Sequence, residues 1–159
     1  MERLERNYWP MMKVAIAAAA AAGPLGSLTG PADMIAVTGI WTTLLISMMN
    51  KAECKISPKN AKTIATAVAT GAVSYYVGCK VASWMFYLIP FAGVAGAIGI
   101  STAANILFTY RFGLSIASMI EKNIVDCRDK SLLLEIATPL FRKLPSIGEL
   151  REIKTIYGK

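Results

Sequence analysis

The chain has 159 residues and a net charge of +7, from 17 basic and 10 acidic residues. Apolar residues make up 55% of it and charged residues 17%, against roughly 25% charged residues in ordinary soluble domains. This balance is typical of a one-domain membrane protein with a small polar portion. The basic residues flank apolar stretches and form no arginine-rich run, which argues against nucleic acid and favours anionic lipid headgroups as a partner.

The amino-acid composition gives little indication that the protein is an enzyme. The chain has no histidine, which removes most acid–base, triad and metal arrangements. No strand precedes the glycines at 93, 96 and 99 and no Lys-Ser/Thr follows them, so their spacing does not indicate a phosphate loop. We therefore expect no enzyme, no cofactor and no metal. Cys54, Cys79 and Cys127 show no C-x-x-C spacing and are interpreted as reduced thiols.

Residues 11–22 form a short apolar segment that only Lys13 interrupts. As a helix it extends ~18 Å, too short to cross a bilayer alone. Gly-Pro pairs at 23–24 and 30–31 predict breaks on either side of a loop or tight turn. We expect a half-span or a surface-lying helix here, and the sequence leaves open whether it crosses fully.

Residues 34–50 carry no charge, and with their flanks they reach ~28 Å, enough to cross the hydrocarbon core. Asp33 precedes them as a helix-start acid that caps or charges the first turn; the alternative is an intramembrane functional acid. A lysine-rich loop at 50–62 follows, and the positive-inside rule places it in the cytoplasm.

A helix at 61–79, with Asn60 as its predicted N-cap, is dominated by small residues. Small residues at four-residue spacing let helices approach closely and indicate helix packing or self-association; the alternative is an alanine-rich helix without a specific partner. The residues with this role are Ala65, Ala67, Ala69 and Gly71. Four hydroxyl residues share another face and serve either as the polar lining of a pore or as interhelical hydrogen-bonding groups; these are Thr63, Thr66, Thr70 and Ser74.

Residues 81–110 run for 30 residues without an Asp, Glu, Lys or Arg, about 1.5 times the ~20 apolar residues of a spanning helix. Pro90 with its aromatic neighbours predicts the tip of a hairpin at the membrane–water interface. The return helix has packing glycines and two further candidate lining residues before it reaches Arg111. The glycines are Gly93, Gly96 and Gly99, and the polar residues are Asn105 and Thr109.

The tail at 112–159 has apolar residues at helical spacing opposite charged ones, and Ser146 with Glu149 matches a capping box. Such helices pack together, lie on the membrane or bind a partner, and all three remain open. The sequence thus predicts an all-α fold of two helical hairpins, with up to four membrane segments and amphipathic C-terminal helices. We divide it into membrane-embedded hairpins at 1–111 and a basic cytoplasmic tail at 112–159, with both termini in the cytoplasm.

Two stretches, AAAAAAGPLGSLTGPADMIAVTGIWTTLLISM and LIPFAGVAGAIGISTAANILFTYRFG, resemble the YcjF-like family of uncharacterised bacterial membrane domains associated with Era/Ras-type GTPases. The resemblance covers about residues 14–120 through an alanine-rich run, a Pro-x-Asp step and a glycine-rich return helix. It implies a helical module of the bacterial inner membrane that serves a nucleotide-driven partner, and it supplies no site. The chain holds no GTPase domain and lacks the glutamine that often follows the family's first helix.

Three functions remain open from the sequence. The first is a non-enzymatic integral membrane protein that self-associates as a homo-oligomer and scaffolds or anchors a cytoplasmic protein partner. The second is an oligomeric pore or membrane-permeabilising protein. The third is a soluble or peripheral bundle that inserts its hydrophobic hairpin on a trigger.

Overall fold

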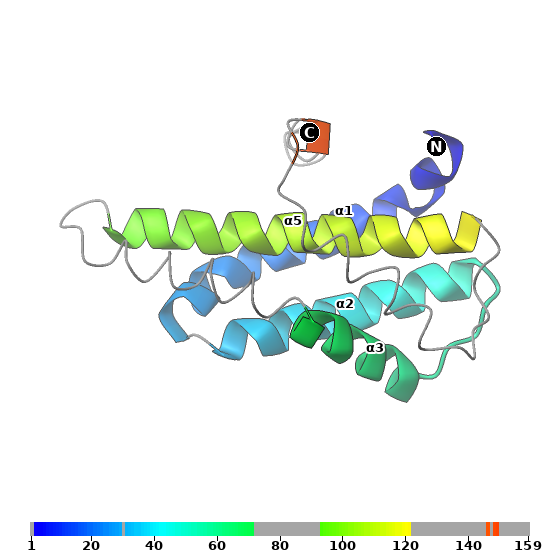
Figure 1. Ribbon diagram of the computed structural model, residues 1–159, viewed down its shortest axis with the longest axis horizontal. Coiled ribbons are helices and arrows are strands. Elements are labelled where there is room, and N and C mark those ends of the chain that lie inside the picture. The colour runs from blue at the N-terminus through cyan, green and yellow to red at the C-terminus, as the bar shows by residue number, and fades with distance from the viewer. Residues whose placement is uncertain (1, 30, 72–92, 122–145, 147, 150–159) are drawn as a thin grey trace.

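The computed structural model describes residues 2–29, 31–71, 93–121, 146 and 148–149 (Figure 1). The helices in this part of the chain are α1 (Glu2–Thr29), α2 (Pro31–Lys51), α3 (Pro58–Gly71) and α5 (Gly93–Glu121). These residues contain no strand, so the prediction of an all-α fold is confirmed for them. The predicted hairpin tip around Pro90 and most of the predicted tail lie outside the described residues.

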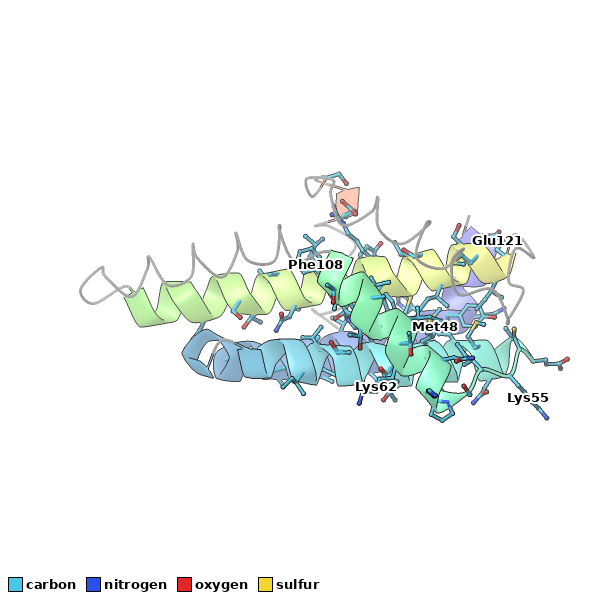
Figure 2. All side chains as sticks on the ribbon, turned by 60° about the horizontal axis from the view of Figure 1, so that its bottom comes forward. Met48, Lys55, Lys62, Phe108 and Glu121 are labelled. Carbon is cyan, nitrogen blue, oxygen red and sulfur yellow. The ribbon has the colours of Figure 1, made fainter. Side chains whose placement is uncertain are left out.

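The helices form a bundle in which α5 contacts both α1 and α2, while α3 packs on α2 (Figure 1). α1 and α2 run antiparallel, and α5 runs in the same direction as α2. The start of α1, the end of α2 and the end of α5 therefore lie at one end of the bundle. Figure 2 shows Lys55, in the connection after α2, and Glu121, the last residue of α5, at this end. We call it the basic end, because Lys51, Lys55 and Lys59 are all exposed in this part of the chain.

α1 is one helix of 28 residues with Pro10 and Pro24 inside it. The break predicted at 23–24 is therefore wrong, and so is the short segment at 11–22, because α1 extends ~42 Å at 1.5 Å per residue. A proline inside a helix removes one backbone hydrogen bond and crowds the preceding turn. The packing of α1 along α5 offsets this cost, since α1 contacts α5 extensively.

α1 and α5 lie very close together at Gly23. Among the glycines whose surroundings the structure describes, Gly23 has the nearest neighbouring atom. A Cβ added to it would lie 2.3 Å from Thr102 Oγ1 and 2.7 Å from Thr102 Cα. The second of these atoms is backbone and cannot move without moving α5. Glycine at this position thus serves helix packing, where the sequence indicated a turn.

The predicted helix at 34–50 is confirmed as part of α2, and Asp33 lies in the first turn of that helix. The predicted N-cap of the next helix, Asn60, is wrong. α3 begins at Pro58, and the Asn60 N–H donates to Ser57 Oγ at 3.2 Å. Serine is a strong N-cap and proline favours the first helical position, so the Ser57-Pro58 pair outcompetes the asparagine.

α5 continues through Arg111 to Glu121 without a break. The division predicted at residue 111 thus falls inside a helix, and Ile116 and Met119 are buried in the core that α1 and α2 share. Glu121 is exposed, which agrees with the apolar stripe predicted for this part of the tail. The remaining tail lies outside the described residues, so the two-part organisation stays a prediction.

Aromatic packing joins α2 to α5. Trp41 of α2 stacks on Phe112 of α5, with ring centroids 4.8 Å apart and an interplanar angle of 13°. The indole Nε1–H of Trp41 donates to Thr109 Oγ1 at 2.9 Å. A buried indole is stable when its N–H finds an acceptor, and this pair of contacts fixes the register of the two helices.

Cys54 is disulfide-bonded, and its partner lies outside the described residues. The interpretation of all three cysteines as reduced thiols is therefore wrong. Any two of the three cysteines can form a disulfide if the fold brings their Cα atoms within about 7 Å of each other. Sequence spacing carries no information on such a contact.

We expect Gly23→Ala to destabilise the bundle by about 1–3 kcal/mol, because the new Cβ overlaps the α5 backbone. Gly99→Ala is the matched control: a Cβ at Gly99 meets nothing within 4 Å, so this change should be neutral or stabilise the helix by up to about 1 kcal/mol. Chemical denaturation in detergent, followed by far-ultraviolet circular dichroism, measures both. Equal effects of the two substitutions would contradict the close α1–α5 crossing.

Candidate functional site

The interior of the bundle contains a stripe of polar side chains on α5. Ser101, Asn105 and Thr109 are fully buried and recur every fourth residue, so they share one helix face. Asn105 Nδ2 donates to the Ala19 carbonyl of α1 at 3.4 Å, and Thr109 accepts the Trp41 hydrogen bond from α2. The stripe therefore links α5 to both of its neighbours.

The structure does not bring the two halves of the predicted polar lining together. Asn105 and Thr109 are buried inside the chain, whereas Thr63, Thr66 and Thr70 are exposed on the outer face of α3. Thr63 and Thr70 donate to helix carbonyls four residues earlier, at 2.9 and 2.8 Å. Ser74 lies outside the described residues.

The small residues predicted to pack helices lie in different surroundings. Ala65 and Ala69 are buried in the core of the chain itself, and Ala67 is half-buried. Gly71 is the last residue of α3, Gly93 and Gly96 lie in the first turn of α5, and Gly99 faces open space. Ala65 and Ala69 are thus engaged within the chain, and self-association stays a prediction.

Arg111 of α5 is a buried guanidinium, 2% exposed, and it binds Glu149 from the C-terminal region. Two parallel hydrogen bonds of 3.0 Å join Nε to Oε1 and Nη2 to Oε2. Bidentate pairs of this kind are the strongest form of arginine–carboxylate contact. The pair joins positions 38 residues apart in the sequence.

Glu149 also closes the capping box that the sequence predicted. Its Oε2 accepts the Ser146 N–H at 2.8 Å, and its own N–H donates to Ser146 Oγ at 3.2 Å, which confirms the prediction. The hydrogen bond from Arg111 lowers the pKa of the Glu149 carboxyl; partial burial opposes this, and the Ser146 N–H adds to the lowering. One ionised carboxylate therefore holds the C-terminal segment on α5.

A third feature is an open apolar groove of about 700 Å³ between α1 and α2, which we call the α1–α2 groove. α1 contributes Pro10, Met11, Val14, Ala15 and Ala18. α2 contributes Ala36, Gly39, Ile40, Thr43, Leu44 and Ser47. None of these lining residues is charged. The sequence did not reveal the groove, although the uncharged, alanine-rich course of α1 was a signal for a shallow surface.

Lys51 lies at the end of α2, one helical turn beyond the lining residue Ser47. Its ammonium group donates to the Asn7 carbonyl of α1 and lies 5.8 Å from the centroid of the Tyr8 ring. These contacts hold the exposed lysine across the two helices that form the groove.

No family model, curated protein or solved structure matches this chain.

Within the part of the chain that the structure describes, one segment, Ser101–Glu121, is long and apolar enough to cross a membrane. Of its most apolar stretch, 72% is buried inside the bundle. Length and apolar character thus permit a membrane span here, and enclosure by α1 and α2 is an equally direct account of them.

We expect Glu149→Gln to destabilise the protein by about 2 kcal/mol, because it removes the carboxylate that binds the buried Arg111 guanidinium through two charge-assisted hydrogen bonds. The loss should stay below the ~3–5 kcal/mol of a fully buried pair, since Glu149 is 26% exposed. Glu121→Gln, at an exposed acid on α5, should change stability by less than about 0.5 kcal/mol. Urea denaturation in detergent measures both variants. If Glu149→Gln destabilises an Arg111→Met chain as much as the unmodified chain, the Arg111–Glu149 contact is not the cause.

Protonation should remove the same stabilisation. The pKa of Glu149 is lowered from 4.5 on folding, so its contribution is complete above pH 4.5 and is lost as the pH falls through the folded-state value. The difference in unfolding free energy between the unmodified chain and Glu149→Gln should be constant above about pH 5 and shrink below it. Denaturation series at pH 7, 5, 4 and 3 provide the measurement, and a difference that grows on acidification would contradict the ion pair.

Proposed function

We propose that this chain is a non-enzymatic helical membrane protein that anchors a cytoplasmic protein partner at the bilayer. The observation that carries the proposal is the distribution of charge along the bundle. No Asp, Glu, Lys or Arg occurs in α1 from Val14 to Thr29, in α2 from Met34 to Asn50 or in α5 from Gly93 to Tyr110. Each of these stretches has 16 to 18 residues and extends roughly 24–27 Å, close to the thickness of the hydrocarbon core.

The outward-facing side chains support embedding in lipid. The exposed positions of α1 between residues 14 and 24 hold valine and alanine alone. Val14 and Ile35 are 71% and 76% exposed. A helix on the surface of a soluble protein turns a polar face to water, whereas lipid accepts side chains of this kind.

The basic end supports contact with anionic headgroups. Lys51, Lys55 and Lys59 are all exposed there, with Glu53 as the one acid between them in the sequence. Each lysine near an anionic surface contributes about 1 kcal/mol of attraction. The positive-inside rule favours the cytoplasm for this end and for the protein partner, whereas the Cys54 disulfide favours an oxidising compartment; the vesicle measurement below decides between them. A GTPase as that partner, and a bacterial inner membrane as the location, rest on the family resemblance alone.

A peripheral bundle is the second candidate, and the burial of α5 favours it. Because 72% of the most apolar stretch of Ser101–Glu121 is enclosed by the chain itself, that helix does not need lipid to bury its apolar surface. In this case the protein meets the membrane through its exposed lysines and apolar residues without crossing it.

Alkaline carbonate extraction of membranes from expressing cells distinguishes the two candidates. We expect the protein to remain in the pellet after carbonate treatment and to be released by detergent, because embedded helices do not depend on electrostatic attachment. Release by carbonate alone would overturn the embedded arrangement and establish the peripheral one. Trypsin treatment of sealed inside-out and right-side-out vesicles is the companion measurement: cleavage at Lys55 and Lys59 should occur in the inside-out vesicles only.

A further inference from the structure

The α1–α2 groove has the size and lining of a site for an apolar ligand. Its volume of about 700 Å³ lies within the roughly 300–1,000 Å³ of small-molecule sites. Gly39 lies in its wall, and a Cβ added there would meet no atom within 4 Å. Val14 at its edge is 71% exposed. The space in front of Gly39 is therefore open, and it is bounded by carbon and hydroxyl groups.

A cation lies at one end of this groove. The Lys51 ammonium group rests on the Asn7 carbonyl and near the Tyr8 ring, which places it where α1 and α2 meet beyond Ser47. Within the described residues no carboxylate pairs with Lys51; the ion pair found there joins Arg111 and Glu149. An apolar groove that ends at a positive charge is complementary to a molecule with a long apolar chain and an anionic head.

We infer that the α1–α2 groove binds an anionic membrane phospholipid, with an acyl chain against Gly39 and the headgroup phosphate at Lys51. The inference rests on the proposed function, because it requires the groove to face the bilayer. Lysine binds phosphate as a point charge, and the basic end places Lys51 at headgroup level. The lipid chain covers the apolar surface that α1 and α2 leave exposed.

Charge argues against a second copy of the chain as the occupant. Two copies in the same membrane orientation pair about an axis along the bilayer normal, so the same face of each meets the other. This arrangement brings the two Lys51 groups to the same depth and close together, and juxtaposed like charges oppose association. A phospholipid phosphate neutralises the same group.

Native mass spectrometry of the full chain, released from detergent micelles that contain equal amounts of dioleoylphosphatidylglycerol and dioleoylphosphatidylcholine, tests the headgroup contact. We expect one retained phosphatidylglycerol per chain, favoured about fivefold over phosphatidylcholine, the ratio that corresponds to about 1 kcal/mol per lysine. Lys51→Gln should abolish this preference. Lys55→Gln, which removes an exposed lysine of the basic end outside the groove lining, should lower the preference much less than Lys51→Gln does and should leave one lipid retained per chain.

Filling the groove tests the acyl contact. Gly39→Leu places a side chain in the open space and should reduce the retained lipid at least about fivefold; the substitution also favours the helix, so loss of folding is not expected. Gly99→Leu is the matched control, because Gly99 is an α5 glycine with equally open surroundings outside the groove. It should retain lipid as the unmodified chain does.

The outcomes separate this inference from the proposed function. Equal lipid retention by Gly39→Leu and Gly99→Leu, or no phosphatidylglycerol preference in a chain that carbonate leaves in the membrane, overturns the lipid site alone. Release by carbonate overturns the proposed function first. A dimer that Gly39→Leu dissociates identifies a second copy as the occupant and also overturns the lipid site.

Discussion

Three buried polar contacts of α5 determine how the rest of the described chain is arranged. Asn105 reaches the backbone of α1, Thr109 accepts from Trp41 of α2, and Arg111 binds Glu149 of the C-terminal segment. Leaving a buried polar group without its partner costs about 1–3 kcal/mol, and more for a charge. Apolar packing alone tolerates sliding of one helix along another, so these contacts are what assign α5 a single register against each neighbour.

The sequence was sufficient for the features that depend on local chemistry. The all-α class, the position of α2 and the capping box of Ser146 with Glu149 each follow from residues within a few positions of one another, and the structure confirms them. Local signals in competition were harder to resolve. Asn60 and Ser57 are both good caps, and only the proline between them, which fits the first helical position, decides for Ser57.

Features that depend on distant contacts were not predictable. The Gly-Pro step at 23–24 carries a strong turn signal, yet α1 continues through it because Gly23 fits against Thr102, about eighty positions away. The pairing of Arg111 with Glu149 and the disulfide at Cys54 likewise require the fold to bring separate segments together. The sequence identified Asn105 and Thr109 as candidate polar residues. Their role in holding the helices together became clear only from the helices that they contact.

The alanines of α1 give that helix two different surfaces. On its inner side Ala19 is buried, and its small size lets α5 approach closely enough that there is no room for a methyl group between Gly23 and Thr102. On its outer side Ala18 is exposed and leaves the α1–α2 groove unfilled. A larger residue on the inner side would separate the helices, whereas one on the outer side would close the groove. The alanine-rich stretch of α1 therefore produces a close contact with α5 on one side of the helix and an open groove with α2 on another.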